Sequence, residues 1–417
     1  MKMFPSLLML AMAAGAPAAT TAQAGPIRPE QVGLSTERLK RVDALMARLQ
    51  EQGRLAGAVT VVARRGQLVS LQAHGYAELE TKRPMRADDI FQIQSMSKPI
   101  ASVMALMLLE EGRFLLGDPV AKFLPEFESL KIAVKQTDSP GGFALVPARR
   151  SITILDLLTH RAGFTGLPPR ESPASTLLAQ ALKSLPPNGD FTLEHYVKQI
   201  AASPLDSEPG TEFRYGPSTA VLGRLIEVVT GQSLGDALRE RIFVPLGMLD
   251  TAFAVPAEKR SRVVPPYALT PDRGLVRLPM DPLSPRFQSA GGNLFSTPSD
   301  YLRFCQMLLN GGVLDGTRLV SRKSVELMVE PQVDPVPLIF LPGQHFGLGV
   351  AVRRADGQSG LLGSPGSYGW SGAYNTYFRI DPREQLIVML FTQLAFSPSN
   401  LELQYGFHNS VMQAIVD

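Results

Sequence analysis

The sequence predicts a mixed α/β (α+β) fold in which one antiparallel sheet, built from both termini of the chain, is flanked by helices. Segments typical of strands lie near residues 57–71 and again near residues 374–392, and the chain between them shows mainly helical spacing. The length of 417 residues is too great for one ordinary domain. We therefore expect an α/β domain made of residues 25–95 and 285–417, a mainly helical domain over residues 96–284, and an active site between them.

A helix and a hairpin are predicted at the start of the chain. Apolar residues recur at helical spacing over residues 36–53. Residues 57–63 and 67–71 are rich in strand-forming side chains, and Arg64-Arg65-Gly66 between them is typical of a tight hairpin turn. These two segments are the N-terminal contribution to the sheet.

The middle of the chain is expected to be helical with irregular excursions. Helices are predicted over residues 96–111, 152–158, 218–230 and 232–242, and Gly112 is the expected C-cap of the first of them. Three segments are rich in turn-forming residues and are expected to be irregular: residues 136–150, 254–290 and 331–346.

The C-terminal part returns to strand patterns. Residues 374–380 and 385–392 are predicted strands on either side of the turn Asp381-Pro382-Arg383, and residues 403–416 are a predicted closing helix. Because strands occur at both ends and helices between them, we expect one sheet that combines the two termini.

Charge and metal-binding residue types exclude several classes of function. The chain has 41 Lys and Arg against 38 Asp and Glu, with no clustered basic run, so no nucleic-acid partner is expected. The single cysteine, Cys305, excludes an internal disulfide, and the five histidines include no H-x-x-x-H pair. We expect no metal site and no cofactor.

The first 24 residues resemble a targeting segment. Lys2 precedes a short apolar run over residues 7–14, and Ala22-Gln23-Ala24 is a typical cleavage signal. This pattern predicts a secretory signal peptide cleaved near Ala24, and hence a bacterial periplasmic or secreted protein without a stable membrane anchor. The alternative is a frayed apolar helix at the N-terminus.

The first candidate for chemistry is Ser95-Met96-Ser97-Lys98. Residues three apart at the start of a helix lie on the same face, so Lys98 is expected beside Ser95. A neutral amine can accept the hydroxyl proton, and burial disfavours the charged form of an amine. The alternative is a serine N-cap followed by an exposed lysine.

Two further segments carry polar or small residues at turns. Tyr215 lies on a Gly-Pro turn before a helix, where its hydroxyl can share protons with Ser95 and Lys98. Trp370-Ser371-Gly372-Ala373 runs into the strand at 374–380, and we expect an edge strand there with backbone N–H groups free to bind an oxyanion. The alternatives are a packed turn tyrosine and a Gly-rich turn with a core tryptophan.

Taken in order, these segments resemble the three motifs of the serine β-lactamase and penicillin-binding-protein superfamily. The motifs are Ser95-Met96-Ser97-Lys98, Tyr215-Gly216-Pro217 and Trp370-Ser371-Gly372, and Leu157-Leu158-Thr159-His160-Arg161-Ala162-Gly163 is similar to the L-L-T-H-x-x-G stretch of that superfamily. The resemblance covers about residues 30–415. It is greatest to the class C β-lactamase-like esterases, the family VIII carboxylesterases, and implies a β-lactamase-like fold.

The resemblance implies a role for each matching residue. Ser95 would be the nucleophile that forms an acyl-enzyme, with Lys98 and Tyr215 as the base network. The backbone N–H groups of Ser95 and Ala373 would hold the oxyanion, and Trp370 would line the pocket. We expect three more residues to contact the substrate: Gln94, Ser371 and Gly372.

Two departures from the β-lactamase pattern affect the expected substrate. β-Lactamases of this branch usually carry Lys-Thr-Gly where this chain has Trp370-Ser371-Gly372, and an asparagine where it has Pro217. Losing a charge-assisted hydrogen bond costs roughly 1.5–3 kcal/mol, which disfavours anionic substrates. We therefore expect hydrolysis of short-acyl carboxylic esters. A β-lactamase or D-alanyl-D-alanine carboxypeptidase, an acyltransferase and a non-catalytic cell-envelope binding module are the alternatives.

A second serine motif competes with Ser95. Gly231-Gln232-Ser233-Leu234-Gly235 matches G-x-S-x-G, and His345 or His408 would be its partner. It follows a predicted helix rather than a strand, so Ser233 is interpreted as a helix N-cap. His160 is expected only to shape a turn below the site.

Overall fold

The computed structural model describes residues 25–136, 138–167, 170–186, 190–280, 286–336, 343–355, 359–397 and 401–417. The predicted signal peptide, residues 1–24, lies outside the described residues. Within the described ranges no helix combines the length and the apolar character that crossing a membrane requires.

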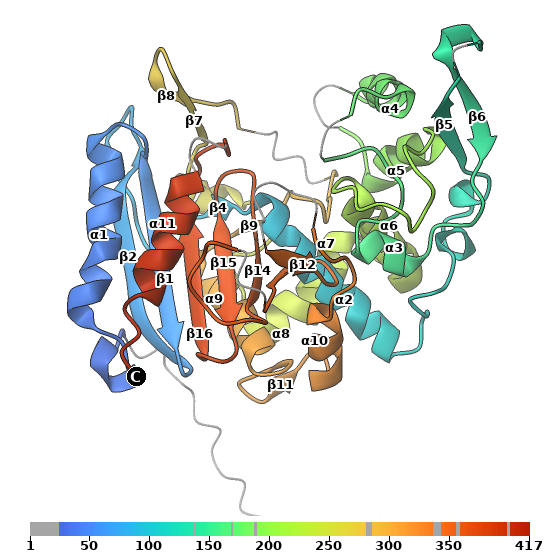
Figure 1. The fold of residues 1–417 in the computed structure, drawn as a ribbon. Coiled ribbons are helices and arrows are strands. Elements are labelled where there is room, and N and C mark those ends of the chain that lie inside the picture. The colour runs from blue at the N-terminus through green and yellow to red at the C-terminus, as the bar shows by residue number, and fades with distance from the viewer. Residues whose placement is uncertain are drawn as a thin grey trace, which may run out of the picture.

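The central element is an eight-stranded antiparallel sheet in the order β12-β13-β14-β15-β16-β1-β2-β3 (Figure 1). Its strands are β1 Gly57–Arg64, β2 Gln67–Glu78, β3 Arg83–Pro84, β12 Gln344–Phe346, β13 Ala351–Arg353, β14 Tyr368–Ser371, β15 Tyr377–Asp381 and β16 Leu386–Phe391. The two termini meet where β1 pairs with β16, with Val61 opposite Met389. This confirms the predicted antiparallel sheet made from both ends of the chain.

The turn between β1 and β2 has the predicted hairpin chemistry. Arg65 and Gly66 both have positive φ, 53° and 74°. Two successive residues of positive φ form the type of tight turn whose twist matches that of the strands it joins. The turn therefore fixes how β1 and β2 pair at the N-terminal side of the sheet.

The helices flank this sheet, and most of them lie in the sequence between its N-terminal and C-terminal strands. They are α1 Thr36–Glu51, α2 Ser97–Glu110, α3 Ile154–Leu158, α4 Pro173–Lys183, α5 Leu193–Ala202, α6 Ser218–Thr230, α7 Leu234–Leu238, α8 Val244–Leu246, α9 Pro298–Leu309, α10 Arg322–Val329 and α11 Leu401–Met412. Helices α1 and α11 pack together over one face of the sheet (Figure 1). Helix α9 contacts β15 and β16, and α2 lies in the same core as these strands.

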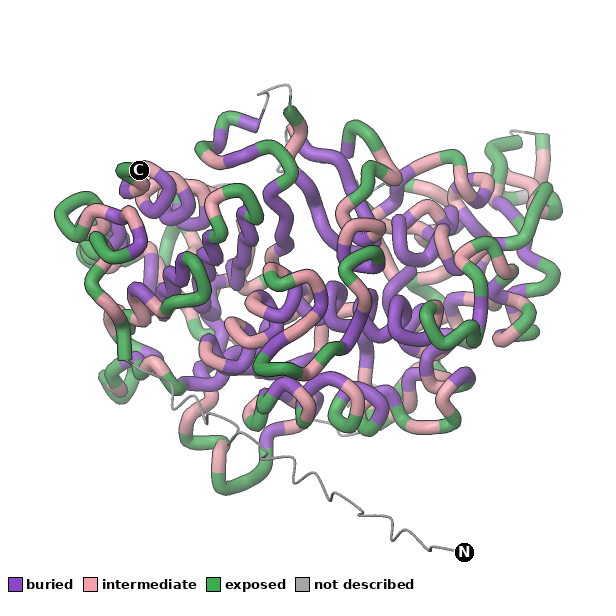
Figure 2. The backbone as a smooth tube through the Cα atoms, turned by 90° about the horizontal axis from the view of Figure 1, so that it is seen from below, coloured by how far each residue is buried: buried purple, intermediate pink, exposed green. Residues whose placement is uncertain are grey.

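One buried cluster extends from the sheet into the helical part. It includes Val61 of β1, Met104 of α2 and Leu222 of α6. Figure 2 shows buried backbone running through the middle of the molecule and into both sides. The division into domains at residues 95/96 and 284/285 stays a prediction, and the two parts share this core.

Two predicted irregular segments contain short hairpins, which corrects the sequence analysis. Strand β6 Phe143–Pro147 lies inside 136–150 and pairs with β5 Lys131–Lys135. Strands β7 Tyr267–Thr270 and β8 Gly274–Arg277 pair inside 254–290. Each is a two-stranded ribbon of four or five residues per strand, and segments so short give little periodicity for a sequence to show.

The strand that leads to Ser95 is held by pairing and by a polar network. β4 Phe91–Gln92 pairs with β9 Phe295–Ser296, and Ile93 N–H donates to Leu294 O at 2.9 Å. Behind β9, the buried Asp300 accepts hydrogen bonds from the backbone N–H of Asp250 at 2.7 Å and from Thr251 Oγ1 at 2.9 Å.

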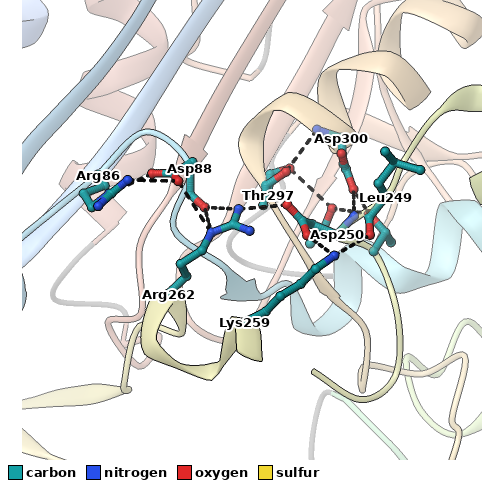
Figure 3. Close-up of polar contacts among 10 residues, drawn as sticks. Arg86, Asp88, Leu249, Asp250, Lys259, Arg262, Thr297 and Asp300 are labelled. Atoms are coloured by element: carbon teal, nitrogen blue, oxygen red, sulfur yellow. Dashed lines mark hydrogen bonds and ion pairs between the residues drawn. The ribbon is translucent and has the colours of Figure 1, made fainter. Parts of the chain in front are cut away.

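Figure 3 shows the ion pairs that continue this network. Arg262 forms an ion pair with Asp250 at 2.8 Å and a longer one with Asp88 at 3.6 Å. Lys259 pairs with the other carboxylate oxygen of Asp250 at 2.7 Å. The network joins the loop after α8, the start of α9 and the segment before β4, so it holds the approach to Ser95 from both sides.

We expect His408 on α11 to make stability depend on pH. Its Nε2 lies 2.7 Å from Leu362 O and its Nδ1 lies 3.1 Å from the Tyr377 hydroxyl. A carbonyl oxygen only accepts, so Nε2 carries the proton and the neutral ring has both nitrogens bonded. Burial, followed by the charge of Arg379, lowers the pKa of His408 to about 4.

The sign of the effect follows because the unfolded chain binds the proton more readily. The stabilisation by neutral His408 is complete above about pH 6.5, the ordinary histidine pKa. It is lost as the pH falls, and at pH 4 the loss in the free energy of unfolding reaches about 3 kcal/mol. Urea unfolding at pH 7 and pH 4.5 measures it. The loss is expected to shrink in His408→Asn and to persist in His195→Asn, a matched change at an exposed histidine. Equal losses in the two variants would contradict this assignment.

Candidate active site

Ser95 lies on a tight turn between β4 and α2. The turn is a short 3-10 segment, Gln94–Met96, and Ser97 Oγ closes it by donating to Gln94 O at 2.7 Å. Gln94 has a φ of 49°, a left-handed conformation that costs a non-glycine residue about 1 kcal/mol or more. Such strain persists only where surrounding contacts impose it, and it is common at functional sites.

Lys98 lies beside Ser95, as the helical spacing predicts. Its Nζ is 3.0 Å from Ser95 Oγ and 2.6 Å from Gly291 O, and the side chain is buried. Among the described residues, no carboxylate lies within 4.0 Å of this amine to form an ion pair. The amine therefore contacts neutral oxygen atoms and one aromatic ring.

That ring belongs to Tyr215. Lys98 Nζ lies 4.8 Å from the ring centroid. The Tyr215 hydroxyl accepts a hydrogen bond from Trp370 Nε1 at 3.2 Å, and the two rings are 5.3 Å apart. Backbone hydrogen bonds in both directions between Tyr215 and Leu167, of 3.0 and 2.7 Å, hold the tyrosine segment before α6. The structure thus brings together residues from all three motifs.

His160 has a closer relation to the site than the sequence analysis expected. It does occupy a turn, with a φ of 54°, but its buried ring lies 4.7 Å from that of Tyr215. Its Nδ1 accepts a 3.4 Å hydrogen bond from Gly216 N–H. Burial and, secondarily, the charge of Lys98 hold the pKa of His160 well below its ordinary value. The ring therefore supports Tyr215 as a neutral group. The motif around His160 was visible in the sequence, but its contact with Tyr215 depends on the fold.

The third motif lies on an interior strand, which corrects the expected edge strand. β14 lies between β13 and β15, but pairing with β13 ends at Gly369, opposite Ala351, because β13 has only three residues. The strand predicted from residue 374 begins at Tyr377. A turn precedes it, in which Gly372 N–H donates to Thr376 O at 2.8 Å.

This turn packs directly on the Ser95 segment. Thr376 Oγ1 donates to Ile93 O at 3.1 Å, and a Cβ added at Gly372 would lie 2.4 Å from that same oxygen. A glycine is required at 372 by this close approach. Ala373 follows as an exposed residue, and its N–H makes no hydrogen bond with the described residues.

A cavity of about 430 Å³ opens beside these residues. It is lined by Gln94, Lys98, Leu178, Tyr196, Gly216, Pro217, Ala220, Phe287, Ser289, Gly291, Gly292 and Asn293. Trp370 and Ser371, also expected to contact the substrate, line a separate space of about 20 Å³, enough for about one water. Of the four residues expected to contact the substrate, Gln94 is therefore the one that lines this cavity.

The competing serine has a structural role. Ser233 is the N-cap of α7, where its Oγ accepts from Asp236 N–H at 3.1 Å and donates to Asp236 Oδ2 at 2.7 Å. His345 Nε2 lies 3.2 Å from Val329 O, and His408 bonds Tyr377 and Leu362. Neither histidine is hydrogen-bonded to Ser233, which agrees with its interpretation as a cap.

Comparison with known proteins decides the family. The model of the family described as Beta-lactamase matches residues 42–408. The chain belongs to this family. Protein Rv1367c of Mycobacterium tuberculosis is 34% identical to it over 357 residues, covering 82% of this chain and 87% of that protein. Esterase EstB of Burkholderia gladioli is 28% identical over 390 residues, covering 89% and 94%.

A solved structure has the same fold as this member of the beta-lactamase family. EstCE1, described as a hydrolase with promiscuous acyltransferase activity, matches with a TM-score of 0.74 at 24% identity, covering 90% of this chain and 98% of that one. The family and the β-lactamase-like fold expected from the three motifs are thereby confirmed.

Proposed function

We propose that the chain is a serine hydrolase that cleaves carboxylic esters through an acyl-Ser95 intermediate. The contact that carries this proposal is the 3.0 Å hydrogen bond from Lys98 Nζ, which lines the cavity, to Ser95 Oγ. Membership of the beta-lactamase family and similarity to an esterase, EstB, support it. The substrate is a small neutral ester.

Acylation uses the three polar groups that the fold places together. Ser95 Oγ bonds to the ester carbonyl carbon while its proton passes to the Lys98 and Tyr215 network. The carbonyl electrons return, the bond to the alcohol oxygen breaks, and the network gives the proton to the leaving alcohol. Lys98 is suited to this role because its neighbours are neutral acceptors and the Tyr215 ring.

Deacylation reverses these roles with water. The network takes a proton from water, the water oxygen bonds to the acyl carbon, and the bond to Ser95 Oγ breaks. Ser95 recovers a proton and a carboxylic acid leaves. In both steps we assign the oxyanion to the backbone N–H groups of Ser95 and Ala373, which lie at the two segments that Gly372 brings into contact.

The cavity favours neutral esters over anionic β-lactams or peptide carboxylates. Among its described lining residues Lys98 is the only basic side chain, and it is engaged with Ser95 and Gly291. Trp370 occupies the position of the usual third-motif lysine, and its Nε1 donates to the Tyr215 hydroxyl. A carboxylate bound here would lack the charged partner that its burial requires.

A paired assay with covalent labelling tests the proposal. The purified protein is given p-nitrophenyl butyrate and a chromogenic cephalosporin, and a fluorophosphonate probe is mapped by mass spectrometry. We expect ester turnover, little lactam turnover and a label on Ser95. Dominant lactam turnover would favour a β-lactamase or carboxypeptidase. A label on Ser233 would refute the nucleophile, and neither label nor turnover would favour a binding module.

Removing the Tyr215 hydroxyl is expected to slow catalysis while the ring stays in place. Tyr215→Phe keeps the ring beside Lys98 but deletes the acceptor of Trp370 Nε1. We expect kcat to fall about 10²-fold, because proton transfer loses one of its groups. Steady-state kinetics with p-nitrophenyl butyrate, which give kcat and KM separately, measure this. A loss seen only in KM, with kcat unchanged, would assign Tyr215 to binding alone.

We further propose that residues 1–24 direct export and are removed. The apolar run and the Ala22-Gln23-Ala24 signal support this. Mass spectrometry of the exported protein is expected to give an N-terminus at Gly25. An N-terminus at Met1 in the exported protein would contradict it.

A further inference from the structure

The cavity has an aromatic wall that lies outside all three motifs. Phe287 packs against Phe191 with ring centroids 4.6 Å apart and against Tyr196 at 5.3 Å. Tyr196 comes from α5, and Leu178 of α4 lies on the same cavity. Figure 1 shows α4 and α5 together in the helical part of the molecule. The cavity therefore has flat apolar surfaces in addition to the polar groups near Ser95.

One hydrogen-bonding group of this wall has no partner among the residues that the structure describes. The Tyr196 hydroxyl makes no hydrogen bond with any described residue, although the side chain is half-buried and lines the cavity. Burial raises the pKa of Tyr196, so the phenol keeps its proton. A donor left unpaired in a partly desolvated site favours a ligand that supplies an acceptor.

We propose that Tyr196 and Phe287 set the substrate class, which is an ester with an aryl group that carries a hydrogen-bond acceptor. The inference rests on the proposed ester hydrolysis at Ser95 and specifies its substrate. Phe287 and Tyr196 offer the tilted ring contacts that aromatic groups prefer. The Tyr196 hydroxyl donates to the acceptor on the aryl ring.

Three acetate esters separate the two contacts. Ethyl acetate lacks a ring, phenyl acetate has the ring, and 4-acetylphenyl acetate adds a carbonyl acceptor. Tyr196→Phe is expected to lower kcat/KM about fivefold for 4-acetylphenyl acetate alone. Phe287→Leu is expected to lower it about fivefold for both aryl esters and to leave ethyl acetate unchanged. Each variant is compared with wild type on the same ester, so leaving-group reactivity cancels.

Tyr76→Phe, at an exposed tyrosine of β2, is the matched control and is expected to change none of the three rates. If Tyr196→Phe and Phe287→Leu lowered kcat/KM equally for all three esters, or for none of them, the inference would be overturned. The proposed function would stand as long as turnover depended on Ser95. Absence of Ser95-dependent turnover of all three esters in the wild type would overturn both.

Discussion

Ser95→Ala is expected to lower kcat/KM for p-nitrophenyl butyrate by roughly 10⁴-fold or more, because loss of a nucleophile that acts with its base as one unit removes nearly all catalysis. Lys98 Nζ lies 3.0 Å from the Oγ that this change deletes, and its other hydrogen-bond partner is Gly291 O. The rate that remains in Ser95→Ala measures the rate enhancement that substrate binding and the backbone hydrogen-bond donors provide without the nucleophile. Steady-state kinetics, with the enzyme at a concentration far below that of the ester, measure kcat/KM for both proteins.

Ser233→Ala is the control for this experiment because Ser233 belongs to the competing G-x-S-x-G motif. Its side chain caps α7, so we expect a stability loss of about 1 kcal/mol and unchanged ester turnover. Circular dichroism and thermal unfolding verify that both variants fold. Activity that survives Ser95→Ala and disappears in Ser233→Ala would reverse the assignment.

Lys98→Met is expected to lower kcat by roughly 10³-fold, since the acylation and deacylation steps both lose their base. Methionine fills much of the space of the lysine stem, and the buried site holds no carboxylate partner that the change would leave unpaired among the described residues. We therefore expect little loss of stability. Lys122→Met changes an exposed lysine and is expected to retain full activity.

Single-turnover kinetics distinguish a base from a binding group. Loss of the base slows formation of the acyl-enzyme at saturating ester concentration. Loss of a binding group leaves that maximal rate unchanged and raises only the ester concentration needed to reach saturation. Acylation of Lys98→Met at the wild-type rate under saturation would contradict the role proposed for Lys98.

The central fold could be predicted because its signals are local. The hairpin between β1 and β2 is encoded by strand-forming runs around Arg65 and Gly66, and α2 by a continuous apolar segment. The contact between Ser95 and Lys98 follows from one helical turn. These relations need no knowledge of distant parts of the chain.

The particular contacts that distant segments make with one another could not be predicted, although the joining of the two termini in one sheet could. Three-residue strands such as β12 and β13 become strands only through their neighbours in the sheet, and they place β14 inside it. The approach of His160 to Tyr215 and of Tyr196 to Phe287 joins separate elements. The hydrophobic periodicity of a single helix or strand carries no information about which residues of another element it will contact.

The pairing of β1 with β16 also constrains when the protein can fold. Thr60 and Leu390 are partners in neighbouring central strands, although most of the chain separates them. During synthesis β1 and β2 emerge first, and β1 stays without its second neighbour until the last strand has left the ribosome. A chain that ends before residue 386 would leave β1 paired only with β2, and β15 paired only with β14. Completion of the sheet is therefore a late, nearly full-length event, and the Ser95 site, assembled from segments on both sides of that gap, forms with it.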